Sequence, residues 1–558
     1  MKTFKELEYT RIDEDTMVNS VKQRTEELKN AKNAGEAEEV FFALQEDTKE
    51  VMTQSSIAHI RNTVDMNDKF YEDEVKYWSG VMPKIAVLRK EFNTVLLESP
   101  YRKELEERWG SLLFKNLETQ KIFADERLVE DKIEESNLSN EYAKTVASAK
   151  TEFNNESCNF YGLLKYMTNP DRNIRKEALV AWSNLYESIA PKLDELYDKL
   201  CENRRRQAKT LGFDSYIDMV YLQRERYDYT PKDIENFRNN IKKYIVPVAK
   251  REYLKQQERL GVDKLHYYDE SLFFKEGNPV PQGTTSELVD KAQKMYAELS
   301  EETKEFFDFM KEHELFDLET KEGKRQGGYA TSLPKYKAPF IFSNFNGTSA
   351  DVDVLTHEAG HCFMGYLSAR SQKIMDYCWS TSEINEIHSM AMEFFTHPWM
   401  ELFFNEDADK YRQFHLSDSY TNICYLTAVD EFQHKVFERE NTTADERKEI
   451  WHQIEEDYLP WRDYDGIKFL EEGGFWMQKQ HIFLYPFYYI DYALAQLCAL
   501  QYFIRMNQDN EKAWSDYLHL CKMAGSKGYF ELLKEGNLDN PFKEETISSI
   551  VEGLEEYL

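Results

Sequence analysis

Over long stretches of the chain, apolar residues recur every three or four positions. One example is the series that follows Pro83: Ile85, Leu88, Phe92, Val95 and Leu96. This spacing places the apolar side chains on one face of an α-helix. Helix breakers are rare as well, because the 558 residues include only 21 Gly and 14 Pro. The pattern predicts a mainly helical protein.

The helical pattern is interrupted between residues 321 and 347. Gly and Pro punctuate this segment, and short apolar runs such as Pro-Phe-Ile-Phe-Ser-Asn at 339–344 lie between them. Apolar runs bounded by turn residues are typical of β-strands. We therefore expect one small β-sheet at about 321–347, with helices resuming after Ala350 and continuing towards Leu558.

The charge of the chain is strongly negative. It carries 71 Lys and Arg against 102 Asp and Glu, a net charge of −31. Phosphate backbones and anionic lipids attract basic surfaces, so we expect neither a nucleic-acid partner nor docking on a membrane. The basic run Arg204–Arg206 is expected to be a solvated helix face rather than a docking patch.

Two further features bear on location. No run of 18 apolar residues occurs, so no membrane-spanning helix is expected. The first residues lack the apolar core of a secretory signal, and the seven Cys are scattered without C-x-x-C spacing. This combination predicts a cytoplasmic protein with reduced thiols.

The strongest chemical motif follows directly after the predicted sheet, in Val-Leu-Thr-His-Glu-Ala-Gly-His at 354–361. His357 and His361 are four residues apart, so both rings project from one face of a helix. Two imidazole nitrogens so placed suit one Zn²⁺ at about 2.0–2.1 Å. Glu358 is rotated to the side, where it can reach a water molecule rather than the metal. The segment has the H-E-x-x-H pattern of zinc peptidases and predicts one Zn²⁺ per chain.

A catalytic zinc needs a third protein ligand. The next helix-like segment offers Glu383, Glu386, His388 and Glu393. Glu386 and Glu393 share a helix face with Met390, where a buried carboxylate is costly unless a cation compensates it. Spacing alone does not choose between Glu386 and Glu393.

The two segments His-Glu-Ala-Gly-His and Glu-Ile-His-Ser-Met-Ala-Met-Glu-Phe-Phe resemble the thimet oligopeptidase / oligoendopeptidase F family of zinc metallopeptidases. The likeness is closest to the Pz-peptidase-like bacterial oligoendopeptidases and covers most of the chain from about residue 150 on. In that family the third ligand is a Glu at the position of Glu386, 25 residues after His361. The resemblance also implies that Glu393 and Asp353 lie behind the ligands and orient them.

A polar aromatic cluster lies farther along the chain, at residues 481–492. Tyr485, Tyr489 and Tyr492 are spaced four and three, which would form one stripe on a helix. A core stripe explains this spacing, but buried phenols need hydrogen-bond partners. The resemblance implies that Tyr492 and His481 contact the oxyanion or the transition state. Tyr485 and Tyr489 would support them, and the spacing leaves Tyr488 as an alternative to Tyr489.

The resemblance further implies a mainly α fold: a large helical zincin-type metallopeptidase of two lobes around a deep channel. We expect an N-terminal helical lobe at 1–200 and a catalytic lobe at 201–558 that carries the small β-sheet and the zinc helix. The run at 339–344 looks like the family's edge strand beside that helix. Phe342 and Asn344 would then bind the substrate backbone by β-addition.

The sequence thus predicts a cytoplasmic zinc endopeptidase that hydrolyses internal bonds of short unstructured peptides, with Glu358 as general base. One alternative is a helical zinc exopeptidase, a metallocarboxypeptidase or dipeptidyl carboxypeptidase, which would cut near the C-terminus. The other is a non-catalytic peptide-binding scaffold, which would hold no stoichiometric metal. The sequence predicts neither the cleavage preference, nor the physiological peptides, nor the oligomeric state.

Overall fold

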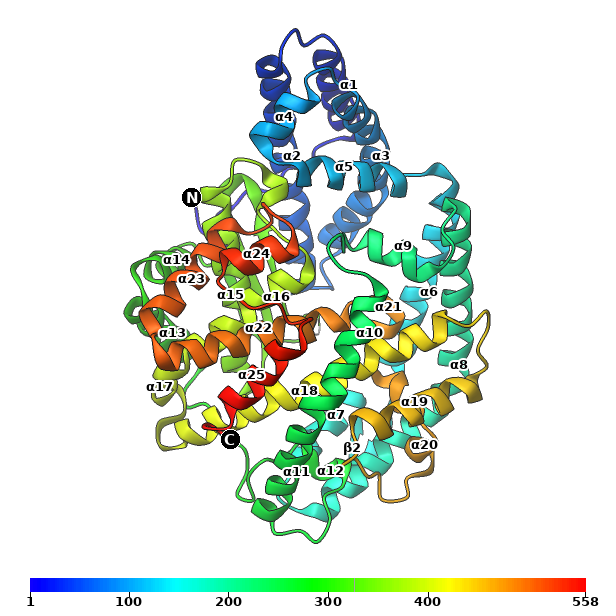
Figure 1. Ribbon diagram of the computed structural model, residues 1–558, viewed down its shortest axis with the longest axis vertical. Coiled ribbons are helices and arrows are strands. Elements are labelled where there is room, and N and C mark those ends of the chain that lie inside the picture. Colours follow the sequence, from blue (N-terminus) through cyan, green and yellow to red (C-terminus); the bar gives the residue numbers. More distant parts are fainter. Residues whose placement is uncertain (326) are drawn as a thin grey trace. The chain divides into compact units, whose positions relative to one another are not determined.

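The protein is mainly helical in a computed structural model that describes residues 1–325 and 327–558 (Figure 1). The predicted helical fold with little β-structure is confirmed. No helix among the described residues combines the length and apolar character that crossing a membrane requires.

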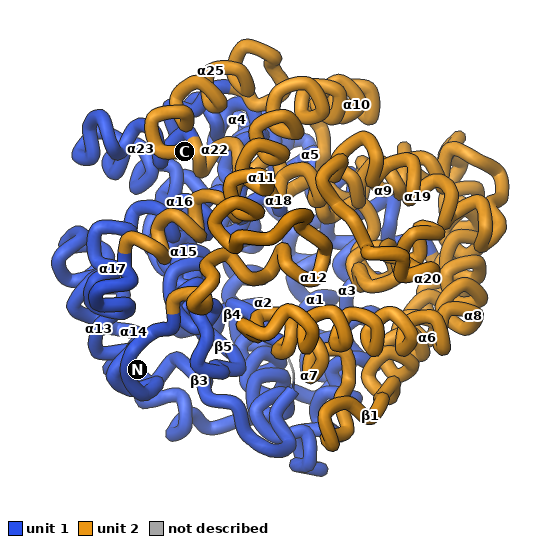
Figure 2. The backbone as a smooth tube through the Cα atoms, turned by 90° about the horizontal axis from the view of Figure 1, so that it is seen from below, with its two compact units in different colours: residues 1–125, 280–408, 501–539 blue, residues 126–279, 409–500, 540–558 orange. Residues whose placement is uncertain are grey.

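The chain forms two compact units, each assembled from three separate stretches (Figure 2). Unit 1 contains residues 1–125, 280–408 and 501–539, and unit 2 contains residues 126–279, 409–500 and 540–558. The lobe boundary expected at residue 200 falls inside the 40-residue helix α8 (Arg172–Leu211). The structure therefore groups the chain differently from the predicted lobes 1–200 and 201–558.

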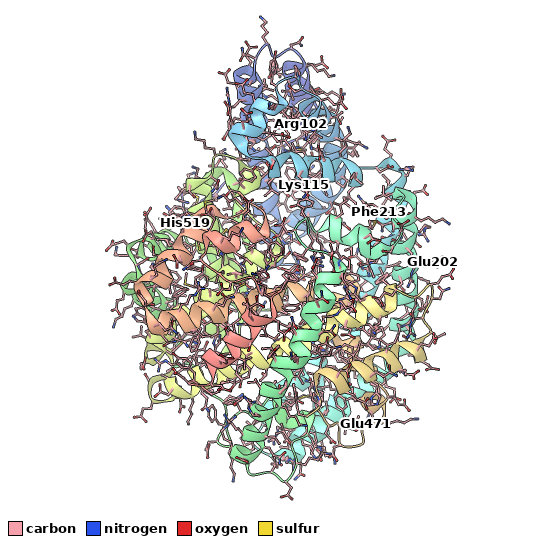
Figure 3. All side chains as sticks on the ribbon, in the orientation of Figure 1. Arg102, Lys115, Glu202, Phe213, Glu471 and His519 are labelled. Atoms are coloured by element: carbon pink, nitrogen blue, oxygen red, sulfur yellow. The ribbon has the colours of Figure 1, made fainter. Side chains whose placement is uncertain are left out.

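Unit 1 begins with five helices and continues with a helical layer around a small sheet. Its helices are α1 (Glu14–Lys29), α2 (Ala34–Val64), α3 (Lys69–Leu97), α4 (Arg102–Trp109), α5 (Ser111–Phe123), α13 (Thr285–Leu299), α14 (Glu301–Glu312), α15 (Ala350–Ser371), α16 (Ser382–Phe395), α17 (Met400–Phe404), α23 (Asn510–Met523) and α24 (Tyr529–Glu535). The first five helices bury a shared aromatic core in which Phe41 stacks on Trp109 at 4.5 Å. Arg102, labelled in Figure 3, joins α4 to α5 through Glu118.

The sheet of unit 1 has three strands, β3 (Phe316–Glu319), β4 (Tyr329–Leu333) and β5 (Ala338–Phe345). Their order is β3-β5-β4, with β3 parallel and β4 antiparallel to β5. The expectation that 339–344 forms an edge strand is wrong, because this run lies in the central strand. Phe342 pairs with Asp317 on one side and with Tyr329 on the other, so its backbone has no free edge for a substrate.

The predicted substrate residues Phe342 and Asn344 have partners within unit 1. The Phe342 ring is fully buried and stacks on Tyr329 with ring centroids 4.9 Å apart. The Asn344 amide donates hydrogen bonds to the carbonyl oxygens of Arg325 and Gly327, just before β4. Both side chains therefore shape the sheet, and the strands at its two ends are β3 and β4.

Unit 2 is a helical assembly with one hairpin. Its helices are α6 (Val129–Ser148), α7 (Phe160–Leu164), α8, α9 (Tyr216–Gln223), α10 (Pro231–Asn240), α11 (Val246–Leu260), α12 (Tyr267–Glu270), α19 (Ala444–Tyr458), α20 (Lys468–Glu471), α21 (Gln480–Leu484), α25 (Glu544–Leu554) and most of α18 (Ala408–Phe437) and α22 (Tyr489–Gln508). The hairpin of β1 (Thr151–Phe153) and β2 (Glu156–Cys158) was not predicted. Asn154 and Asn155 both have positive φ at its two-residue turn, and such Asn pairs favour this turn.

The basic run on α8 is only in part the solvated helix face that we expected, because Arg206 is exposed and Arg204 is buried. Arg204 is 1% exposed, and its Nε donates to Glu135 Oε1 at 2.8 Å. Arg206 Nε donates to Asp131 Oδ1 at 2.8 Å, on the same helix α6. Arg204 and Arg206 therefore pair with the acidic face of α6 within unit 2.

Candidate metal centre

Two helices of unit 1 carry the predicted metal ligands. α15 follows β5 directly and presents His357 and His361, and α16 presents Glu386. The turn before α15 is fixed by Asp351, whose carboxylate accepts the backbone N–H groups of Asn346 and Gly347 at 2.9 and 2.8 Å. Gly347 has a φ of +83°, a left-handed conformation that glycine adopts without strain.

A glycine in the motif lets α16 approach α15 closely. A Cβ atom built on Gly360 would lie 2.7 Å from both the His388 carbonyl oxygen and the Ser389 Cα. Only a residue without a side chain fits at this crossing. Because Gly360 directly precedes His361, this contact sets how near Glu386 comes to the two histidines.

The three predicted ligands converge. Nε2 of His357 and Nε2 of His361 each lie 3.4 Å from Glu386 Oε2. One donor atom from each residue lies within 4.8 Å of the other two. The side chain of Glu386 is only 5% exposed, whereas that of His357 is 24% exposed. A group of two imidazoles and one carboxylate is the donor set of many catalytic zinc sites, so these residues fit the expected metal.

Polar neighbours orient the donors. His357 Nδ1 lies 2.6 Å from Glu393 Oε1, which leaves Nε2 free to face Glu386. The Ser389 hydroxyl donates to Glu386 Oε2 at 3.2 Å. Asp353 lies one helical turn before His357 on α15, and its predicted supporting role stays a prediction. Carboxylates that bind the second nitrogen of a ligand histidine fix its tautomer and raise its basicity.

Electrostatics couple the donors to each other. Burial disfavours the charged ring, but hydrogen bonds with Glu386 and Glu393 outweigh it and raise the pKa of His357 well above its usual value. Burial also opposes the charged carboxylate, yet the charge of His361 and hydrogen bonds with both histidines lower the pKa of Glu386. A metal ion bound by these three side chains therefore displaces a proton.

His388, the neighbouring candidate on α16, differs from the three donors. Its ring is fully buried and packs near Tyr517, and burial lowers its pKa to about 3. Its two ring nitrogens have no hydrogen-bond partner among the described residues. His388 is therefore a neutral core histidine rather than a donor of the converging group.

Glu358, the predicted general base, lies on α15 between the two histidines and is partly exposed. Sequence reasoning overlooked Asp351, Gly360 and Ser389. Of these, only Gly360 left a usable signal, since a glycine inside an apolar helical pattern often marks a close packing contact.

The second predicted cluster lies in unit 2. The His481 ring has Tyr485, Tyr488, Tyr489 and Tyr492 around it, with centroid distances of 5.8, 6.1, 4.7 and 6.3 Å. The predicted stripe of Tyr485, Tyr489 and Tyr492 does not form on one helix, because α22 begins only at Tyr489. Tyr485 lies in the preceding turn and is 51% exposed.

The two candidates Tyr488 and Tyr489 have different environments. Tyr489 is 8% exposed and has Lys479 Nζ 4.8 Å from its ring centroid. Tyr488 is partly exposed and packs against Tyr492, with ring centroids 5.2 Å apart. Tyr488 and Tyr492 are therefore both more accessible than Tyr489.

Comparison with known proteins identifies the family of the chain. The family description "Peptidase family M3" matches residues 165–549, and "Peptidase M3 N-terminal domain" matches residues 4–123. A solved structure described as a putative oligoendopeptidase F has 44% sequence identity and a TM-score of 0.94, and covers 100% of this chain and 98% of that chain. A Pz peptidase A structure with an inhibitor also has 44% identity and a TM-score of 0.94, covering 99% and 98%.

Among curated proteins, an oligoendopeptidase F homologue of Borreliella burgdorferi is 25% identical over 373 residues. This match covers 65% of the chain, and the chain spans 61% of the length of that relative. The fold is that of the oligoendopeptidase F structures. The chain belongs to peptidase family M3, and the resemblance inferred from its motifs is confirmed.

Proposed function

We propose that the protein is a zinc-dependent oligoendopeptidase that hydrolyses internal bonds of short peptides. The observation that carries this proposal is the convergence of His357, His361 and Glu386 within 4.8 Å, with Glu358 on the same helix as the histidines. Membership of a peptidase family supports it, and so does the likeness to oligoendopeptidase F structures.

In the proposed mechanism, His357, His361 and Glu386 hold Zn²⁺, and Glu393 keeps the His357 ring in the tautomer that presents Nε2. Zinc, when bound, supplies Lewis acidity and lowers the pKa of water to about 7. Glu358 accepts the proton of the attacking water and passes it to the leaving amine. Glu386 would bind the metal as a carboxylate, the ionised form in which Glu serves as a zinc ligand.

Hydroxyl donors would stabilise the oxyanion. Tyr492 and His481 keep the role that the resemblance implies, and Tyr488 joins them because it packs against Tyr492 in unit 2. Tyr489 is mostly buried and supports the cluster, and Tyr485 is assigned to the substrate rather than to the oxyanion. Loss of one such donor typically costs about 10²–10³ in kcat.

The substrate backbone would pair with β4 rather than with β5. β4 is hydrogen-bonded to β5 along one edge, and it is an end strand of the three-stranded sheet. Main-chain pairing along a strand edge recognises extended peptides with little dependence on their side chains. The Asn344 amide would support substrate binding by β4 indirectly, because its hydrogen bonds hold the backbone just before β4.

Mapping cleavage sites by mass spectrometry in a panel of peptides of mixed length tests the proposal. We expect cuts at internal bonds, complete loss of cutting with a chelator, and recovery with Zn²⁺ or Co²⁺. Cuts confined to the C-terminal residues would instead indicate the exopeptidase. Absence of both cleavage and stoichiometric metal would indicate the scaffold. Cytoplasmic location, the predicted channel and the absence of a nucleic-acid partner stay predictions.

A further inference from the structure

The turn that carries the tyrosine cluster has an unfavourable backbone conformation. It connects α21 to α22 through residues 485–488, and Phe487 within it has a φ of +59°. A bulky residue adopts this left-handed region only where its surroundings hold it there, and such strain concentrates at functional sites. Phe487 is completely buried, so the neighbours that hold the turn lie inside unit 2.

Two arginines from another turn of unit 2 bind the backbone of this segment. Arg226 Nη2 donates to the Phe487 carbonyl oxygen at 2.5 Å, and Arg224 Nε donates to the Pro486 carbonyl oxygen at 3.0 Å. On the other side, the N–H of Phe487 donates to Gln433 Oε1 at 2.9 Å. Both polar groups of the strained residue are thus bound by side chains.

The same arginines bind the first turn of α22. Arg226 Nη2 lies 2.6 Å from Asp491 Oδ1, and the two side chains are 0% and 1% exposed. Arg224 Nη1 lies 3.7 Å from Asp491 Oδ2. One nitrogen of Arg226, Nη2, therefore joins the strained carbonyl to a buried carboxylate. The shorter side chain of a lysine does not bring its ammonium to the position of Nη2.

These contacts surround the tyrosines on both sides. The backbone N–H of Asp491 donates to the carbonyl oxygen of Tyr488 at 2.9 Å, and Tyr492 is the next residue. The Arg224 guanidinium carbon lies 5.0 Å from the ring centroid of Tyr488. Fixing Phe487 and Asp491 therefore fixes the backbone that bears Tyr488 and Tyr492.

We propose that Arg226, assisted by Arg224, is a positioning residue for the reaction. It binds the strained turn and Asp491 together and so aligns the hydroxyls of Tyr488 and Tyr492 for the transition state. This inference rests on the proposed function, in which those hydroxyls serve the oxyanion. An ordinary core ion pair would stabilise unit 2 without affecting catalysis selectively.

The test is the variant Arg226→Lys, measured as holoenzyme on an internally quenched peptide. We expect kcat to fall by roughly 10- to 100-fold, the size of effect that misplacement by about 1 Å produces. KM and metal content should stay near wild type. Amide hydrogen exchange in residues 485–488 should become faster in the same variant.

Arg175→Lys is the matched control. Arg175 Nη2 lies 2.6 Å from Asp269 Oδ1, with side chains 3% and 0% exposed, and Arg175 also binds backbone carbonyls. Arg175 and Asp269 thus form an equally buried pair in unit 2, and the contacts of Arg175 described above do not involve the 485–488 turn. We expect Arg175→Lys to lower stability while leaving kcat close to wild type.

A double-mutant cycle with Tyr492→Phe separates positioning from general stability. If Arg226 acts through Tyr492, the loss caused by Arg226→Lys should shrink once the hydroxyl is gone. Equal losses in both backgrounds, or a kcat of Arg226→Lys within two-fold of wild type, would overturn the inference.

A second variant keeps the test decisive if Arg226→Lys does not fold. Arg224→Gln removes the hydrogen bond from the Arg224 guanidinium to the Pro486 carbonyl oxygen and leaves the Arg226–Asp491 pair intact. The Arg224 side chain is 17% exposed, so its replacement disturbs the core less than replacement of Arg226. We expect a smaller loss in kcat with the same coupling to Tyr492, and additive effects would overturn the inference. A fully active Tyr492→Phe would instead refute the assigned role of Tyr492, and a wild type without metal-dependent cleavage would refute the proposed function.

Discussion

At the residue scale, Glu386 and Glu393 contact different atoms although they lie seven positions apart on one face of α16. Glu386 approaches Nε2 of both histidines, whereas Glu393 approaches Nδ1 of His357. Spacing could not separate them, because both carboxylates point the same way along the helix. The family resemblance selected Glu386, and the geometry of this chain supports that choice.

Glu393→Gln should weaken metal binding without removing a ligand. The neutral oxygen of Gln can still accept from His357 Nδ1 but lacks the charge of the carboxylate, so the ring loses part of its basicity. We expect roughly 10- to 100-fold lower zinc affinity, measured by competition with a chromogenic chelator. Glu305→Gln is the control, because Glu305 accepts a hydrogen bond from Tyr366 of α15 outside the donor group. Equal affinities in Glu393→Gln and wild type would contradict this role.

Glu455 should make stability depend on pH. Burial raises the pKa of this carboxyl to about 7, against an opposing effect of Arg462. The folded state therefore holds the proton more tightly than the unfolded state. Glu455 therefore contributes to the free energy of unfolding fully below pH 4.5, and this contribution is lost as pH rises through 7.

Urea unfolding of wild type and Glu455→Gln at about pH 5 and about pH 8 measures this effect. The stability of wild type relative to the variant should fall over that range, by roughly 3 kcal/mol at most. A difference that does not change with pH would show that Glu455 titrates normally in the folded protein.

The tyrosine cluster shows where residue-level prediction stopped. Helical spacing predicted one stripe of Tyr485, Tyr489 and Tyr492, but the left-handed Phe487 separates α21 from α22. Nothing in the local sequence marks Phe487 as left-handed, since the arginines that hold it are more than 200 positions away. Spacing therefore could not choose between Tyr488 and Tyr489, and the role of Tyr488 stays a proposal.

At the element scale, partners that are not evident from the local sequence also explain why the edge strand was misplaced. The run at 339–344 is almost continuously apolar, as is typical of a strand buried on both faces. That signal favoured a central strand, but its partners β3 and β4 are short and mixed in polarity. The family resemblance, rather than this pattern, predicted an edge strand at 339–344. The long amphipathic helices, by contrast, were predictable from periodicity alone.

Gly360→Ala should disturb the contact of α15 with α16. The added Cβ would meet backbone atoms of α16 at 2.7 Å, and a backbone cannot move aside as a flexible side chain does. We expect at least about 1–3 kcal/mol of destabilisation, together with weaker metal binding as Glu386 moves away. Thermal unfolding and metal titration check both effects.

Gly80→Ala is the matched control at this scale. Gly80 lies inside α3 of the same unit, and its added Cβ meets nothing within 4 Å. Replacing an unstrained helical glycine should be neutral or stabilise by about 0.4–1 kcal/mol. If both alanine variants behave alike, the close approach at Gly360 does not control the site.

At the scale of the whole molecule, the sequence did not predict the two discontinuous units. Each unit gathers stretches that are hundreds of residues apart, and no local pattern records such pairing. The composition was informative in a different way. A net charge of −31 predicted that no basic binding surface exists, and this stays a prediction. Arg204 and Arg206 of the basic run of α8 pair with α6 within unit 2.

Metal binding should stabilise unit 1, which contains all three donors. Binding to the folded state alone adds about 4 kcal/mol when free metal exceeds its Kd a thousand-fold. We expect Zn²⁺ added to chelated protein to raise Tm and to slow hydrogen exchange in α15 and α16. His361→Ala should show neither change, and a Zn²⁺ response of that variant equal to wild type would place the metal elsewhere.

The central claim is that Glu358 is the general base beside a metal held by His357, His361 and Glu386. The rate of internal cleavage by Glu358→Gln, loaded with one metal per chain, tests it most directly. Gln keeps the shape of the side chain but cannot take the proton, so kcat should fall by at least about 10²-fold while the metal stays bound. A metal-loaded Glu358→Gln enzyme with the kcat of wild type would contradict the account.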